Sequence, residues 1–191
     1  MNDFVTRALA CAALLLATAC GSAAAQQQRD RDTLRREALP ETLVERADAA
    51  ASVGDLTRAE QYYVAALTAG GDDKPVVQRL LRVCVADQRY PVAAHYAEQY
   101  LRRHPRDWDI TFAAASIQAA LGRHEAAQRL LEQVVRERPS SAEAHYALAS
   151  VLRDRGEATE RADEHDLQYL KLEPGGPFAE TARARLTGAM P

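Results

Sequence analysis

From Pro40 onward, apolar and small side chains recur in blocks that come into register when the sequence is shifted against itself by thirty-four residues. Each block divides into two amphipathic stretches of about 12 to 14 residues, which predicts two helices per block. A fixed period of this length is typical of a stacked helical array. The recurring positions are Ala47, Leu81, Ala115 and Ala149; Ala59, Ala93 and Ala127; and Ala66, Tyr100 and Val134.

Glycine and proline mark the ends of the predicted helices. Gly54, Gly122 and Gly156 share one column between the two helices of a block, because glycine readily adopts the left-handed backbone that ends a helix. Gln88 occupies this column in the second block, so we expect modest backbone strain or a different turn there. Proline lacks an amide proton and restricts the residue before it, and therefore closes a block. The closing positions are Gly71, Pro105, Pro139 and, one residue late, Pro174.

These boundaries predict an all-α protein made of four helix hairpins. One hairpin cannot cover its own apolar face, so stacking must complete the core. Small residues in the Ala47 and Ala59 columns allow the two helices of a hairpin to approach closely. The hairpins are expected at residues 40–73, 74–107, 108–141 and 142–175, followed by a capping helix from Pro177 to Leu186 within residues 176–191.

The spacing and residue types of all four blocks resemble the tetratricopeptide repeat. The resemblance implies a right-handed superhelix, an α-solenoid, in which the first helix of each hairpin lines a concave side. Matching positions in the first two blocks are Leu43, Ala47, Gly54, Asp55, Leu56, Ala59, Tyr63, Ala66 and Leu67, then Leu80, Leu81, Tyr90, Ala93, Tyr100, Leu101 and Pro105. In the last two they are Ala115, Gly122, Ala127, Leu131, Val134 and Pro139, then Leu148, Ala149, Leu152, Gly156, Ala162 and Pro174.

The same resemblance implies a partner-binding groove on the concave side. Phe112 and Tyr146 are rigid aromatic side chains of the kind that dominate interface energetics, although packing between helices accounts for them about equally well. The lysines and asparagines with which some relatives grip an acidic chaperone tail are missing. The groove positions are Val44, Asp48, Gln78, Arg82, Phe112, Ser116, Tyr146, Ser150 and Arg153.

The N-terminal residues have the pattern of an export signal, with Arg7 followed by an apolar run too short to span a bilayer permanently. The end of residues 1–19 and Cys20 resemble the lipobox of bacterial lipoproteins, which implies lipidation of Cys20. By the same resemblance, Gly21 implies the outer membrane. Residues 20–39 then form a flexible tether, with helix expected from about Thr33. An alternative is ordinary signal cleavage after Ala25, which would release a soluble protein.

Composition argues against a nucleic-acid partner. The net charge is −3, and the chain's two lysines and 22 arginines are scattered along the predicted helices. A basic footprint of the kind that nucleic-acid binders carry is therefore not expected.

The sequence gives little support to catalysis, a metal or a cofactor. None of the five histidines has a partner at ligand spacing, and Gln128 stands where a zinc-protease helix beginning at His124 needs its second histidine. With Cys11 and Cys20 removed or modified, Cys84 is left as a single thiol in an apolar helix, which favours a buried hydrophobic role. A histidine-dependent hydrolase supported by the array is the alternative from another class.

Taken together, the sequence predicts an exported, lipid-anchored, non-enzymatic scaffold on the periplasmic face of the outer membrane. It would hold a protein or peptide segment during assembly of an envelope complex of the pilus, secretion or outer-membrane assembly type. The alternative is a soluble periplasmic module with the same fold.

Overall fold

The computed structural model describes residues 25–71, 74–156 and 159–188, and over these ranges the chain forms helices and no strands. A first helix covers residues 25–37. The helices that follow are α2 (Pro40–Ser52), α3 (Leu56–Thr68), α4 (Lys74–Ala86), α5 (Tyr90–Arg103), α6 (Trp108–Ala120), α7 (His124–Glu137), α8 (Ala142–Asp154), α9 (Thr159–Leu172) and α10 (Ala179–Leu186).

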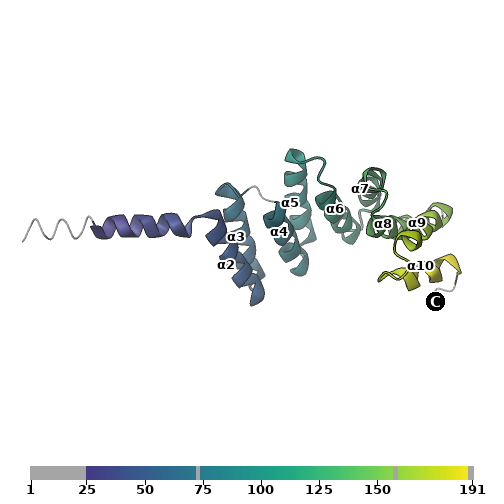
Figure 1. Cartoon of the computed structure of the whole chain (residues 1–191), viewed down its shortest axis with the longest axis horizontal. Coiled ribbons are helices and arrows are strands. Elements are labelled where there is room, and N and C mark those ends of the chain that lie inside the picture. Colours follow the sequence, from purple (N-terminus) through teal and green to yellow (C-terminus); the bar gives the residue numbers. More distant parts are fainter. Residues whose placement is uncertain (1–24, 72–73, 157–158, 189–191) are drawn as a thin grey trace, which may run out of the picture.

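The helices form a linear array in which each one packs mainly against its neighbours along the chain (Figure 1). The pairs α2–α3, α4–α5, α6–α7 and α8–α9 are the four predicted hairpins, and their helices have 13 or 14 residues each. Beyond the hairpins, α6 also contacts α8. The predicted all-α solenoid is confirmed.

The core lies between helices rather than at one centre. The alanines of the recurring columns, such as Ala47, Ala59, Ala93 and Ala127, are completely buried, which lets the backbones of adjacent helices approach. Larger residues such as Tyr63 fill the spaces between layers. Apolar clusters therefore run along the array, one through α2 to α6, one through α6 to α9 and one under the C-terminal cap. This is the burial that a single hairpin cannot provide.

The glycine column has the backbone that the sequence predicts. Gly54, Gly122 and Gly156 have φ angles of 79°, 70° and 67°. Gln88 adopts the same left-handed conformation, with φ of 58°. The second hairpin thus keeps the turn of the others and places a residue with a Cβ in a conformation that favours glycine.

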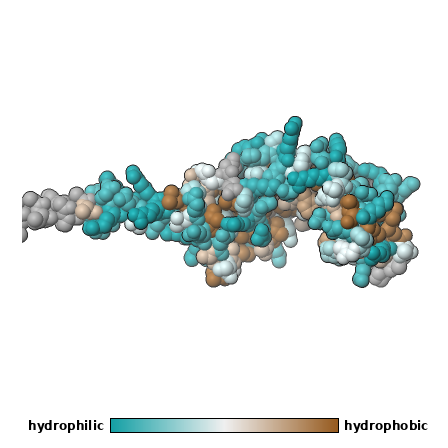
Figure 2. All heavy atoms as spheres, in the orientation of Figure 1, coloured by the Kyte–Doolittle hydropathy of each residue, from teal (hydrophilic) through white to brown (hydrophobic). Residues whose placement is uncertain are grey.

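Residues 25–37 are helical from the start of the described chain, earlier than the expected onset near Thr33. Side-chain pairs four residues apart stabilise this segment: Gln26 donates to Asp30 at 3.0 Å and Gln28 donates to Asp32 at 3.1 Å. Its surface is hydrophilic, whereas hydrophobic side chains appear on the surface over the first hairpin and the C-terminal end (Figure 2). Cys20 and the rest of the predicted signal lie outside the described residues. Within those residues, no helix is long and apolar enough to span a membrane.

The short helix α10 closes the C-terminal end of the array. Ala179 and Ala182 are buried against α9, and the rings of Phe178, Tyr146 and Tyr169 contact one another. The Tyr169 hydroxyl accepts a hydrogen bond from the Phe178 backbone amide at 2.9 Å. The predicted capping helix is therefore present.

Candidate functional site

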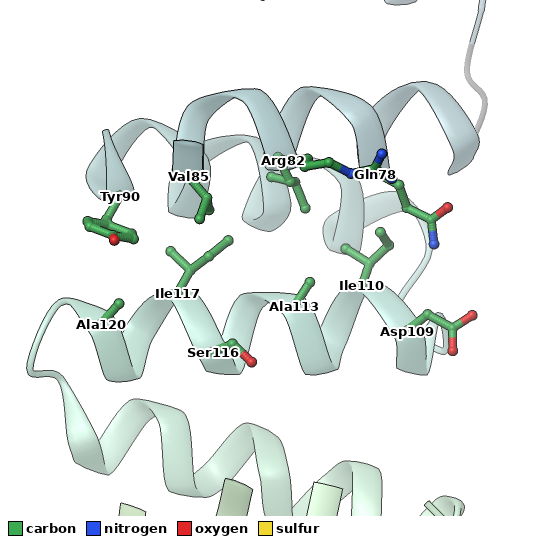
Figure 3. A pocket seen from close by; sticks show the side chains of 11 residues that line it. Gln78, Arg82, Val85, Tyr90, Asp109, Ile110, Ala113, Ser116, Ile117 and Ala120 are labelled. Atoms are coloured by element: carbon green, nitrogen blue, oxygen red, sulfur yellow. The ribbon is translucent and has the colours of Figure 1, made fainter. Parts of the chain in front are cut away.

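An apolar groove of about 480 Å³ opens between α4 and α6, the first helices of the second and third hairpins (Figure 3). Its floor consists of side chains that the two helices present at intervals of three, four and seven residues, the spacing of one helix face. Tyr90, at the start of α5, closes one end. The lining residues are Gln78, Leu81, Arg82, Val85, Tyr90, Asp109, Ile110, Ala113, Ser116, Ile117 and Ala120.

The groove has an apolar end and a polar end. Tyr90, Val85, Ile117 and Ala120 gather at the apolar end in Figure 3, whereas Gln78 and Asp109 lie at the opposite end. The helices α4 and α6 both begin at the polar end, so they run parallel to each other along the two sides of the groove.

Cations already neutralise the acidic residue at the polar end. Asp109 forms ion pairs with Lys74, at the start of α4, and with Arg138, which follows α7. The hydrogen bond from Lys74 lowers the pKa of Asp109, and the same bond raises the pKa of Lys74. Lys74 also pairs with Asp107 at 2.9 Å. This network links the second and third hairpins on one side of the groove.

Arg82 lies midway along the groove and carries a charge that no neighbour neutralises. Its side chain is exposed, and among the described residues it has no hydrogen bond or ion pair. The nearby Asp48 of α2 is engaged elsewhere, because it accepts hydrogen bonds from Arg79 at 3.0 Å and from the Tyr63 hydroxyl at 2.6 Å. Burial and the bond to Asp48 raise the pKa of Tyr63 to about 12. The groove therefore combines an apolar floor with one available guanidinium.

Part of the groove lies in a segment that resembles a known family. The tetratricopeptide-repeat family model matches residues 85–151, which include eight of the eleven residues that line the groove. The matched segment, residues 85–151, has the sequence pattern of tetratricopeptide repeats. A search of the curated proteins finds no match.

Solved structures share the fold of this helical array at low sequence identity. MamA residues 41 to the end from Desulfovibrio magneticus are 16% identical, with 79% of this chain and 93% of that chain covered and a TM-score of 0.66. The protein YrrB, described as having an unusual peptide-binding site, is 18% identical, with coverages of 82% and 79% and a TM-score of 0.65. A tetratricopeptide-repeat protein from Parabacteroides merdae is 21% identical, with coverages of 77% and 58% and a TM-score of 0.69.

The structure brings three of the nine predicted groove residues together around the α4–α6 groove, namely Gln78, Arg82 and Ser116. Val44 and Asp48, on α2 of the first repeat, do not line it. Val44 packs partly buried against the core of the first repeats. Ile117 and Asp109 also line the groove and were not among the predicted residues, although the spacing of Ile110, Ala113 and Ile117 in α6 defines this face.

Phe112 faces away from the groove. It is half-buried and packs against the apolar cluster that α6 shares with the following helices. With Trp108, Val134 and Glu143 it lines a separate cavity of about 280 Å³ between α6, α7 and α8. The structure thus shows the packing role that the sequence left open for this side chain.

The C-terminal cap covers Tyr146. Its ring stacks on Phe178 with centroids 4.2 Å apart and an angle of 10° between the planes. The Arg185 guanidinium lies 4.7 Å from the centroid of the Tyr146 ring and donates to Ser150 at 3.0 Å. Arg185 therefore packs against the fourth repeat, and only 13% of its side chain is exposed.

Arg153 also forms contacts within the fourth repeat. Its guanidinium donates to the fully buried carboxylate of Asp166 at 2.6 Å and to Asp163 at 2.5 Å. Arg185 lies 3.6 Å from the other oxygen of Asp166. The side chains of Tyr146, Ser150 and Arg153 consequently contact other residues of the last repeat and the cap.

Two histidines that the sequence spacing did not bring together are in contact. His145 and His165 lie twenty residues apart on the two helices of one hairpin, and their Nδ1 atoms are 3.0 Å apart. The Nε2 of His145 lies 3.1 Å from the Pro139 carbonyl oxygen, to which it donates. Burial lowers the pKa of both histidines. The described chain gathers no group of three histidine, cysteine or acidic side chains that could hold a metal ion.

Proposed function

We propose that this protein is a scaffold that binds a segment of another protein in the groove between α4 and α6. The observation that carries the proposal is the groove itself, an open apolar surface between the first helices of two successive hairpins. Repeat arrays use extended surfaces of this kind for binding, and buried apolar side chains with a few polar contacts are a common mode of segment recognition. We propose no catalytic role for the array.

The binding surface is testable with a matched pair of substitutions. Val85 lines the groove and is 36% exposed, whereas Val53 is 79% exposed at the end of α2 and outside the groove. Placing a lysine at Val85 puts a charge into the apolar end, and we expect Val85→Lys to lose the partner proteins that co-purify with the wild-type chain from its native host. Val53→Lys, the control, should retain them. Equal recovery with both variants would contradict a role for this groove.

We further propose that Cys20 is lipidated and that the array acts in the periplasm, attached to the outer membrane, in assembly of an envelope complex. Support comes from the signal-like residues 1–19, the lipobox-like pattern before Cys20 and the hydrophilic helix at residues 25–37, which would separate the array from the bilayer. Mass spectrometry of the mature N-terminus tests this directly. An acylated Cys20 supports the anchor, and an unmodified terminus at Gln26 supports the soluble alternative.

A further inference from the structure

One charged side chain in the groove, Arg82, has no hydrogen-bond or ion-pair partner in the described chain. Four cations, Lys74, Arg79, Arg82 and Arg138, stand at or beside its polar half. The other three are paired with Asp107, Asp109 or Asp48. Only Arg82, among these four, has no hydrogen bond or ion pair in the described residues.

The position of Arg82 in α4 determines how far an acidic side chain of the partner would lie from its apolar side chains. In α4, Arg82 lies one helical turn from Gln78 and just under one turn from Val85, which is about 5 Å in either direction. A side chain that pairs with Arg82 would therefore stand close to side chains that contact Val85 and Ile117. Arginine favours a carboxylate because its planar donors match the two carboxylate oxygens.

We infer that the groove selects a protein segment in which apolar side chains fill the end near Tyr90 and an aspartate or glutamate side chain pairs with Arg82. This inference rests on the proposed function and names the chemistry of the segment. Charge complementarity supports an acidic residue: a basic segment would bring a second cation beside Arg82, whereas an acidic one would neutralise it. Like charges placed together at an interface disfavour the wrong partner more strongly than the matched pair adds affinity.

The specificity can be measured without knowing the natural partner. A library of random twelve-residue peptides displayed on phage is selected against the full-length chain and against Arg82→Glu, Val85→Lys and Arg102→Glu. Arg102 is an exposed arginine on α5 outside the groove and serves as the matched charge control. Wild type and Arg102→Glu should both enrich peptides with apolar residues and a nearby acid. Arg82→Glu should enrich lysine or arginine at the position of that acid.

The affinity of one selected peptide then shows how much the acidic residue contributes to binding. Replacing its acidic residue by glutamine should weaken binding to the wild-type chain about fivefold, and the same replacement should not weaken binding to Arg82→Gln. If Val85→Lys abolishes the enrichment but the enriched peptides show no preference for acidic residues, the inference about Arg82 is overturned. The groove would then still be a binding site. Enrichment unaffected by Val85→Lys would overturn the proposed groove as well. Selection of basic peptides by the wild-type chain would likewise refute the role of Arg82.

Discussion

Replacing Gln88 by glycine should make this protein more stable, although it removes a side chain. Gln88 is the residue with φ of 58° at the turn between α4 and α5. Its backbone amide donates to the Val85 carbonyl at 3.0 Å, and the next amide, of Arg89, donates to the Cys84 carbonyl at 2.9 Å. The side chain is exposed and makes no hydrogen bond in the described chain, so the substitution removes little besides the strain.

The magnitude follows from two opposing terms. A non-glycine residue in the left-handed region costs about 1–2 kcal/mol, and glycine costs about 0.5–1 kcal/mol because it is freer in the unfolded chain. We therefore expect Gln88→Gly to raise the free energy of unfolding by about 0.5–1 kcal/mol. For a chain of this size the midpoint of thermal unfolding should rise by about 1–4 °C.

Gly122 supplies the reverse experiment in the next repeat. It makes the same pair of turn hydrogen bonds, with φ of 70°, and a Cβ built there meets nothing within 4 Å. Gly122→Ala should therefore lower stability by about 0.5–1 kcal/mol through conformation alone. Urea unfolding followed by circular dichroism, with the m value required to stay constant, measures both changes. Destabilisation by both substitutions would refute the argument, since it would mean that the Gln88 side chain stabilises this turn.

Three further outcomes are expected. Burial raises the pKa of Cys84 to about 11, so with the other two cysteines replaced by serine this thiol should react with a disulfide reagent at pH 8 only as the chain unfolds. Arg153→Met should cost about 3 kcal/mol because it leaves the buried Asp166 carboxylate without its closest partner, and adding Asp166→Asn should recover part of that loss in denaturant titrations. Because the folded pKa of both His145 and His165 is lowered, the unfolded chain binds more protons below about pH 6.5. Stability should therefore fall as the pH drops below that value, and His165→Gln should flatten this dependence in unfolding experiments between pH 5 and 7.5.

The parts of the fold that could be predicted are those encoded locally and repeated. The glycine and proline columns indicated the helix ends because similar turns recur from block to block, and even the exception at Gln88 was visible as a break in the glycine column. The helix at residues 25–37 was expected to begin later because it has no apolar periodicity, and it depends on side-chain pairs such as Gln26 with Asp30. The contact of His145 with His165 depends on how two helices are rotated against each other, which spacing alone does not specify.

The sequence predicted groove residues on α4 but not the apolar groove residues on α6, and it extended the groove into the fourth repeat. Gln78 and Arg82 were placed on the face where the structure opens a groove. Tyr146 occupies the corresponding helix of the fourth repeat, but the docking of α10 and Phe178 covers it, and no repeat position encodes that docking. The rotation of α6 likewise directs Ile117 rather than Phe112 into the groove.

The two ends of the solenoid are sealed unequally. At the C-terminus, the rings of Tyr146, Phe178 and Tyr169 and the buried Asp166 join α10 to the fourth repeat. At the N-terminus, the polar helix at residues 25–37 is exposed almost throughout, and Leu34 keeps 65% of its surface in contact with solvent. Since a stacked array can open one layer at a time, fraying should start at α2 and α3. Amide hydrogens there should exchange earliest, while those of α8 and α9 remain protected longest.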